Sequence, residues 1–256
     1  TATFATTPFP DNMQGASNGA HFNFSLWTNS NKQQKNQGNT DEKESAEKPK
    51  DAASDEKKGS NDSDAKVNAF YDETSKNRLS EVAMYFIGGV LEHINAITIF
   101  SNITANCYRR TNTHAWAPGN ASYGRNNRTV LIRCKTEGNK GTYLEFRLSP
   151  SACNPYMVTA SVLAAGIDGI KNKIQPKYGE CTKDAMGADY EHIPKLPKDL
   201  SEAMEALKKD KIIWNAFGER FCTMLINTKT LELKELEDLA KQIGREKAET
   251  KMFLDI

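Results

Sequence analysis

The sequence predicts an α+β fold, because strand patterns and helix patterns occupy separate stretches of its 256 residues. Residues 19–27, GAHFNFSLW, alternate as a strand does, and their apolar face consists of Ala20, Phe22, Phe24 and Leu26. Residues 129–134 and 142–148, TVLIRC and TYLEFRL, also suit strands, and the GNKG between them predicts a hairpin turn. Residues 82–91 and the stretch after residue 154 instead have apolar residues at helical spacing.

In chain order, residues 1–18 predict irregular chain, since Pro8 and Pro10 break regular structure. The first strand is followed by residues 29–66, which contain no Leu, Ile, Val, Met, Phe, Tyr or Trp. Such a composition cannot bury enough apolar surface to order itself, so we expect a disordered polar insertion in a surface loop. A charged recognition segment is the alternative.

The predicted helices have recognisable first turns. Ser80 suits an N-cap, and the run VAMYFIGGVLEHINAITIF that follows it is interpreted as one buried helix. Asn154 and Pro155 predict the start of the next helix, which is apolar for most of its length. Ser201 is the expected cap of EAMEALKKD, and two amphipathic helices are expected near residues 210–226 and 231–250.

Charge and composition argue against several classes of protein. With 34 basic and 33 acidic side chains, the net charge of +1 gives no support for a nucleic-acid partner. Glu92, His93 and Asn95 interrupt the longest apolar run, which is too short for the roughly 20 residues of a membrane helix. The five cysteines are odd in number and lack a CxxC pair, which favours reduced thiols and a cytoplasmic location.

Two of the predicted strands carry polar side chains opposite their apolar faces. These side chains are His21, Asn23, Ser25 and Trp27 on the first strand, and Tyr143, Glu145 and Arg147 on the last. Paired side by side, the strands would form a polar cleft in which an imidazole and a carboxylate lie close enough to bind Mg²⁺ or Mn²⁺. Four arginines suit carboxylates and phosphates: Arg110, Arg128, Arg133 and Arg147. From the residues alone, an alternative is that these side chains have no function and lie on the solvent-exposed face of a sheet.

Three blocks of sequence resemble the catalytic domain of the type I glutamine synthetase family. They are GASNGAHFNFSLW, NCYRRTNTHAWAPGNASYGRNNRTVLIR and YLEFRLSPSACNPYMVTASVLAAGIDGIKNKI, and they follow the family's order. The resemblance implies that residues 1–256 form one catalytic domain, with a curved, mainly antiparallel sheet lining the cleft and helices behind it. It also implies an ATP-dependent ligase, with ATP as co-substrate and Mg²⁺ or Mn²⁺ in the cleft, that forms γ-glutamyl phosphate from glutamate and transfers the γ-glutamyl group to ammonia.

The resemblance also implies roles for individual residues. The metal ligands correspond to His21 and Glu145. The family's residues near ATP correspond to Asn23, Ser25, Arg128, Arg133 and Lys140. Of these, Arg128 and Arg133 would surround the transferred phosphoryl group, and Arg128 would be the catalytic residue. Glutamate would be bound by Arg110 at its α-carboxylate, by Arg147 at its γ-carboxylate and by Ser17 of the glycine loop.

The chain departs from the family pattern at several positions. Ala16 and Ser17 stand where the family has Asn-Gly, and Tyr143 replaces an arginine that contacts phosphate. Trp116 occupies the position of a glutamate that takes a proton from ammonium, and an indole cannot accept that proton. The alternatives are therefore a γ-glutamyl ligase that uses another amine and a catalytically inactive structural relative.

The resemblance finally concerns parts beyond this chain. It places the remaining metal carboxylates and a small N-terminal domain upstream of Thr1, so the 256-residue chain alone is expected to be inactive. Because the family assembles as stacked hexameric rings, self-association into a dodecamer-like assembly is also expected.

Overall fold

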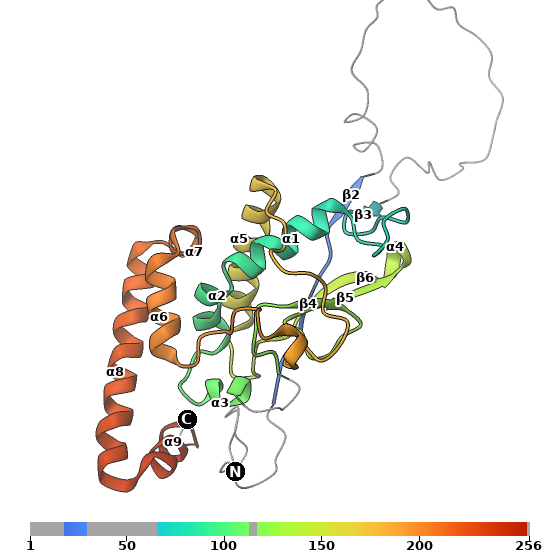
Figure 1. The fold of residues 1–256 in the computed structure, drawn as a ribbon. Coiled ribbons are helices and arrows are strands. Elements are labelled where there is room, and N and C mark those ends of the chain that lie inside the picture. The colour runs from blue at the N-terminus through green and yellow to red at the C-terminus, as the bar shows by residue number, and fades with distance from the viewer. Residues whose placement is uncertain (1–17, 30–65, 113–116, 255–256) are drawn as a thin grey trace, which may run out of the picture.

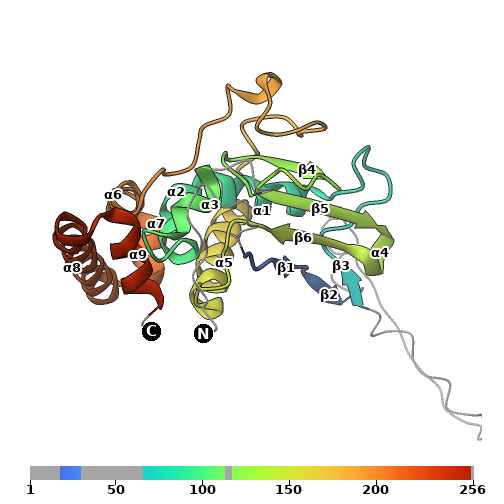
Figure 2. The same cartoon turned by 90° about the horizontal axis from the view of Figure 1, so that it is seen from below.

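The computed structural model describes residues 18–29, 66–112 and 117–254. These residues form an α+β structure in which a mostly antiparallel sheet packs against helices, as the sequence predicts. Figures 1 and 2 show the sheet on one side of α1, α2 and α5, with α6, α7 and α8 on the other side of those helices.

The main sheet has four strands in the order β1-β6-β5-β4. Strand β1 is Phe22–Phe24 and pairs antiparallel with β6, Thr142–Phe146, which pairs antiparallel with β5, Ile132–Glu137. The short β4, Tyr123–Arg125, runs parallel to β5 and makes the sheet mixed. Non-adjacent parts of the chain thus meet in β1 and β6, and this pairing creates the face on which the candidate site lies.

The hairpin predicted from GNKG is present, but its bounds differ from the prediction. Strand β5 starts at Ile132 rather than at residue 129, and GNKG forms the single helical turn α4, Gly138–Gly141, at the tip of the hairpin. The backbone preceding β5 is held by Asn127, whose side-chain oxygen accepts hydrogen bonds from the Thr129 N–H at 2.9 Å and hydroxyl at 2.7 Å. This local turn keeps residues 127–129 out of the strand.

The long first strand is interrupted, and its alternation is confirmed. Phe22, Phe24 and Leu26 pack against the core, whereas His21, Asn23, Ser25 and Trp27 are exposed. After β1 the chain forms β2, Trp27–Asn29, which pairs antiparallel with β3, Lys66–Asn68. Asn29 and Lys66, the ends of the expected insertion, are therefore paired strand residues, and residues 30–65 lie outside the described residues.

The apolar run expected to be one helix is two helices. Helix α1, Glu81–Glu92, is capped by Ser80, whose hydroxyl accepts from the Ala83 N–H at 3.1 Å. Helix α2, Ile94–Ser101, follows at an angle of 74°. His93 stands at the break because its ring hydrogen-bonds to Asp168 and Asp210 on other elements. Among the described residues no single helix is long and apolar enough to cross a membrane, although the bent α1–α2 pair passes on length and composition alone.

Helix α5, Pro155–Asn172, starts as predicted. The Asn154 side chain accepts from the backbone N–H of Tyr156 at 3.0 Å and of Met157 at 3.3 Å. It packs closely against α1, since a Cβ added to Gly89 would overlap the Ala165 carbonyl oxygen and the Gly169 backbone. The two helices form a firm support beneath the sheet, where Phe86 of α1 lies 6.1 Å from Phe24 of β1, centroid to centroid.

The C-terminal helices differ from the prediction in their caps and breaks. Helix α6, Leu200–Lys209, is capped by Asp199 and not by Ser201, because the Asp199 carboxylate accepts from the Glu202 N–H at 2.9 Å. Three helices then replace the two expected: α7, Lys211–Phe217, α8, Glu219–Ile243, and α9, Arg245–Leu254. The breaks fall at Gly218 and Gly244, whose φ values of +83° and +87° suit glycine.

Candidate active site

The polar face of the sheet is built by the register of β1, β6 and β5. Asn23 lies opposite Glu145 in one pair of strands, and Arg133 lies opposite Glu145 in the other. Because directly paired residues project to the same face, these three side chains form a row across the sheet. His21 and Arg147 flank the row at the same end of β1 and β6, so side chains from three strands converge.

The carboxylate of Glu145 is the centre of this cluster. Its Oε1 lies 2.8 Å from His21 Nδ1 and 2.5 Å from an Nη of Arg147. Its Oε2 accepts from an Nη of Arg133 at 3.1 Å. The proximity of His21 and Glu145 that strand alternation predicts is therefore observed, and the solvated-face interpretation does not describe Glu145, whose residue is only 5% exposed.

The two arginines are held firmly and retain unused donors. A second Nη of Arg147 donates to the Arg128 carbonyl oxygen at 2.9 Å. The Nε atoms of Arg133 and Arg147 are buried and lack a hydrogen-bond partner among the described residues. An unpaired buried donor is costly, so the hydrogen bonding of both guanidiniums is incomplete within the described residues.

Arg110 is the third guanidinium of the cluster. It comes from α3, Cys107–Asn112, and donates to the Leu148 carbonyl oxygen at 2.6 Å and to the Arg147 carbonyl oxygen at 3.3 Å. Burial and the charge of Arg147 lower the pKa of Arg110 to about 10, so it remains a cation at neutral pH. Arg110 adds a third guanidinium, close enough for its charge to lower the pKa of His21, and the resulting excess of positive charge suits an anionic ligand.

His21 is the most exposed member of the cluster, with 40% of its side chain accessible. Partial burial lowers its pKa below 6.5, and the charges of Arg147, Arg110 and Arg133 act in the same direction against the opposing effect of Glu145. The imidazole is therefore neutral at pH 7. A neutral imidazole beside a carboxylate has the chemistry of a divalent-cation ligand pair.

The spacing of His21 and Glu145 also fits a shared ion. Adjacent ligands of an octahedral Mg²⁺, each at about 2.0–2.1 Å from the ion, lie about 2.9 Å apart. His21 Nδ1 and Glu145 Oε1 are 2.8 Å apart. Among the described residues no group of three or more His, Cys, Asp and Glu side chains is arranged to hold a metal, so this pair accounts for two ligands.

Apart from Asn23, which lies opposite Glu145 in the row, the other residues assigned from the resemblance are exposed or lie outside the described structure. The Arg128 guanidinium is exposed, and its backbone rather than its side chain contacts Arg147. Ser25 and Asn23 are exposed on the same face, and the Ser25 hydroxyl accepts from the Trp27 indole N–H at 2.9 Å. Lys140 is exposed in α4, at the tip of the hairpin formed by β5 and β6 (Figure 1).

Ser17 and Trp116 lie outside the described residues. Their assigned roles at the glycine loop and at the amine position stay predictions. The neighbouring Gly19 is described, and a Cβ there would lie 2.7 Å from a terminal nitrogen of Arg110. The sequence prediction did not include Gly19 as a residue that lets Arg110 approach the backbone. A glycine directly before the strand that carries His21 is a signal for such an approach, because glycine has no Cβ.

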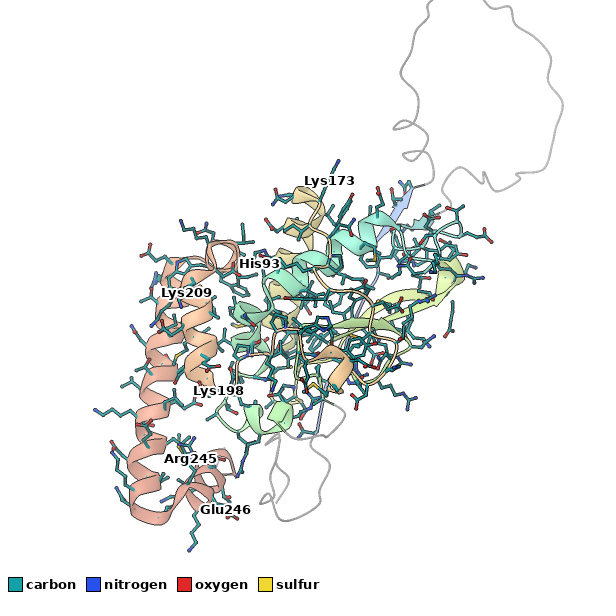
Figure 3. All side chains as sticks on the ribbon, in the orientation of Figure 1. His93, Lys173, Lys198, Lys209, Arg245 and Glu246 are labelled. Atoms are coloured by element: carbon teal, nitrogen blue, oxygen red, sulfur yellow. The ribbon has the colours of Figure 1, made fainter. Side chains whose placement is uncertain are left out.

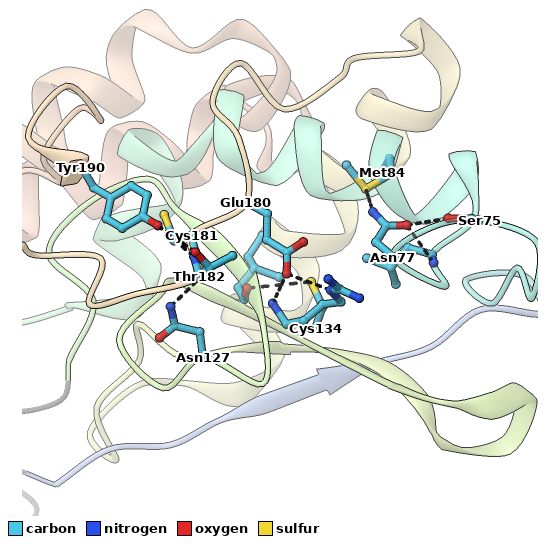
Figure 4. Close-up of polar contacts among 12 residues, drawn as sticks. Ser75, Asn77, Met84, Asn127, Cys134, Glu180, Cys181, Thr182 and Tyr190 are labelled. Carbon is cyan, nitrogen blue, oxygen red and sulfur yellow. Dashed lines mark hydrogen bonds and ion pairs between the residues drawn. The ribbon is translucent and has the colours of Figure 1, made fainter.

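The loop that contains Cys181, Thr182 and Lys183, after α5, holds the backbone turn next to Arg128. Asn127 Nδ2 donates to the carbonyl oxygens of Cys181 at 2.9 Å and Lys183 at 2.7 Å. The Thr182 N–H donates to the Tyr190 hydroxyl at 2.9 Å, as Figure 4 shows beside Asn127. These bonds fix the turn next to Arg128, so that its carbonyl oxygen is held in place for Arg147.

Comparison with known proteins finds matches in one family of catalytic domains. Residues 61–248 match the family model described as "Glutamine synthetase, catalytic domain". The chain is 38% identical over 168 residues to a glutamine synthetase of Methanococcus voltae, in a match covering 64% of the chain and 38% of that relative. It is 42% identical over 147 residues to a glutamine synthetase of Pyrococcus furiosus, a match covering 56% of the chain and 34% of that relative. The matches thus span well under half of these relatives' length.

Solved structures of a protein named GmaS are also similar. An apo form without ligand matches with a TM-score of 0.67 at 27% identity, covering 92% of this chain and 45% of that one. A complex of GmaS with ADP matches with the same TM-score of 0.67 at 28% identity, covering 92% of this chain and 46% of that one.

Proposed function

The chain belongs to the glutamine synthetase catalytic-domain family, and we propose that it is part of an ATP-dependent ligase that forms γ-glutamyl phosphate from glutamate. The phosphate is then displaced by ammonia to give glutamine. The single observation that carries this proposal is the convergence of His21, Arg133 and Arg147 on the Glu145 carboxylate. This arrangement combines a cation-ligand pair with guanidiniums that suit phosphoryl and carboxylate oxygens.

The proposed chemistry depends chiefly on preorganised positive charge. A phosphoryl group in transfer carries negative charge on its equatorial oxygens, and fixed guanidiniums stabilise that charge without rearranging. Arg133 and Arg147 are fixed by Glu145, and each has a buried Nε donor without a partner in the described part of the chain. In this proposal Arg147 binds the γ-carboxylate of glutamate and Arg110 its α-carboxylate, while Arg128 and Arg133 bind the transferred group.

His21 and Glu145 are proposed to hold Mg²⁺ or Mn²⁺. When bound, the metal would neutralise charge on the phosphate oxygens of ATP. The neutral state of His21 at pH 7 and the 2.8 Å spacing of the two ligand atoms support this assignment. Use of ATP is supported by the ADP complex of GmaS, which shares the fold at 28% identity. Asn23, Ser25 and Lys140 are proposed to lie along the nucleotide.

The second substrate is an amine, and separate observations favour ammonia and a larger amine. The curated relatives matched above are named glutamine synthetases, which favours ammonia. Trp116 stands where the family pattern has a proton-accepting glutamate, which favours a larger amine that needs no such acceptor at that position. We propose ammonia as the substrate and another amine as the alternative.

Phosphate release from ATP by the full-length protein tests this function. Glutamate, Mg²⁺ and ATP are supplied with ammonia, methylamine or a polyamine, and without any amine. Release with ammonia supports the glutamine-forming activity, whereas release with another amine and not with ammonia supports the alternative. No release under any condition would contradict the ligase proposal and favour a structural relative. Trp116→Glu should increase the rate with ammonia relative to larger amines.

Assembly and location complete the proposal. We propose self-association into rings, with sites completed at subunit borders, and a cytoplasmic location. All five cysteines are free and buried, which suits a reducing compartment. Mass photometry of the full-length protein checks the assembly: a dodecamer-sized particle is expected, and a monomer at micromolar concentration would contradict it.

A further inference from the structure

Helix α3 lies between the candidate site and the C-terminal helix. Arg110 points to β6, where it donates to the carbonyl oxygens of Leu148 and Arg147. The preceding residue, Arg109, makes an ion pair with Glu249 of α9, with 3.2 Å between an Nη and Oε2. Adjacent side chains of one short helix therefore connect two distant parts of the chain.

Glu249 is an unusual anchor for a terminal helix because it is buried. The residue is 7% exposed, and its Oε1 accepts from Arg245 Nε at 2.7 Å while its Oε2 faces Arg109. Most charged residues of α9 are exposed, including Glu246, which Figure 3 labels with Arg245 at the start of the helix. Arg245 of the same helix already pairs with Oε1. Arg109 supplies a second positive charge at Oε2, which has no hydrogen-bond partner in the described residues, and this ion pair connects α9 to α3.

In the part of the chain that the structure describes, the space between α9 and α3 is partly open. A cavity of about 340 Å³ lies here, lined among others by Tyr108, Arg109, Leu233 and Glu249. Helix α9 packs mainly on α8 rather than on α3. Across this cavity, the Arg109–Glu249 ion pair is a polar contact through which α9 can fix the orientation of α3.

We propose that Glu249 is a positioning residue for the active site: through Arg109 it fixes α3, and so holds Arg110 where it binds the substrate carboxylate. The inference rests on the proposed function for the identity of that carboxylate. Glu249 touches no proposed substrate group and acts through Arg109 and the helix backbone.

A double-mutant cycle in the full-length protein tests this coupling. Glu249→Gln should raise the KM for glutamate about fivefold, which corresponds to about 1 kcal/mol, with kcat and the KM for ATP unchanged within about twofold. Arg109→Gln should have the same effect. The double variant should be no worse than either single one, because both changes remove one interaction. Glu246→Gln, an exposed glutamate of the same helix, is the matched control and should leave all three constants unchanged.

Hydrogen exchange supplies a measurement that does not depend on turnover. Amides of residues 107–112 should exchange faster in Glu249→Gln than in the parent or in Glu246→Gln. Unchanged exchange there, additive KM effects in the double variant, or an equal rise in the KM for ATP would each overturn the inference. An inactive parent protein would overturn the proposed function alone, since the exchange comparison needs no substrate.

Discussion

At the scale of single residues, Glu145 has two competing roles. Its carboxylate neutralises part of the charge of Arg133 and Arg147, and it is also the proposed partner of His21 in binding a cation. A cation bound there would add positive charge to a cluster that already has three guanidiniums and one carboxylate. The site is thus suited to a highly charged anion such as the triphosphate of ATP, which would arrive with the metal.

Glu145→Gln should abolish function while keeping the shape of the side chain. An amide leaves Arg147 and Arg133 without a counter-charge and is a poorer cation ligand, so γ-glutamyl transfer should fall at least about 100-fold. The change should also cost about 3 kcal/mol of stability, as breaking buried ion pairs does. Glu137→Gln, at the exposed end of β5, is the control and should retain full activity. Transfer within about threefold of the parent protein would contradict the role of Glu145.

The residue-level site could be predicted from the sequence only in part. Alternation in two strands was sufficient to place His21 and Glu145 on one face of the sheet. In paired strands, residues that lie opposite one another project to the same face. The contact of Arg147 with the Arg128 carbonyl could not be predicted, since it depends on the turn fixed by Asn127. The approach of Gly19 to Arg110 depends likewise on packing between segments that are distant in sequence.

At the scale of elements, the periodicity of apolar residues predicted which segments are helical. It did not predict where a helix breaks when tertiary contacts cause the break. Ser80 and Asn154 cap their helices as predicted because capping is local. The break at His93 was missed because the partners of its ring are distant in sequence: Asp168 lies in α5 and Asp210 between α6 and α7. At Gly218 the signal was present in the sequence, but glycine alone does not show that a helix stops there.

The crossing of α1 and α5 predicts a strong effect of a small substitution. Gly89→Ala should destabilise the fold by about 2–3 kcal/mol, because the new methyl group overlaps backbone atoms of Ala165 and Gly169 that cannot move independently. Gly179→Ala is the matched control, since a Cβ there meets nothing within 4 Å, and it should change stability by less than about 0.5 kcal/mol. Urea unfolding compares the two, and equal midpoints would show that the helices can separate freely.

His93 predicts a pH dependence of stability. Burial lowers its pKa, but hydrogen bonds and charges of Asp210 and Asp168, at 2.7 and 3.2 Å, outweigh burial and raise the pKa above 6.5. The charged ring therefore stabilises the fold fully below pH 6.5, and this contribution is lost as the pH rises through the raised pKa. The free energy lost in His93→Asn should be larger at pH 5.5 than at pH 9, as measured by urea unfolding.

The exposed His192 provides the control for this pH dependence, since His192→Asn removes an imidazole that has no ion pair in the described structure. Its free-energy difference from the parent protein should be small at both pH values. A destabilisation of His93→Asn that grows with pH would reverse the expected sign and contradict the ion-pair explanation.

At the scale of the whole molecule, chain organisation was easier to predict than sheet order. Segregation of strand and helix patterns indicated an α+β fold, and the resemblance of three blocks, in the family's order, indicated the family that the comparisons show. The parallel pairing of β4 with β5 could not be predicted, because Tyr123–Arg125 is too short for a periodic signal. The pairing of Asn29 with Lys66 was also missed, since both carry the composition of the polar segment.

That pairing makes the polar segment a testable insertion. Asn29 and Lys66 are Cα partners in an antiparallel ladder, and residues 30–65 join them in sequence. Replacing those residues with Asn-Gly would supply a two-residue turn that suits such a ladder. Because closure entropy falls by about 0.6 kcal/mol for each halving of loop length, the shortened protein should be more stable by up to about 2.5 kcal/mol.

Activity separates the two interpretations of this segment. If residues 30–65 are only a tether, the Asn-Gly variant should keep the kcat and KM values of the parent protein, because β2 and β3 retain their register. A variant in which a Gly/Ser stretch of equal length replaces them is the control, since it removes the charges and keeps the loop length. Equal loss of activity in both variants would support a charged recognition segment, whereas loss in the Asn-Gly variant alone would show that loop length matters.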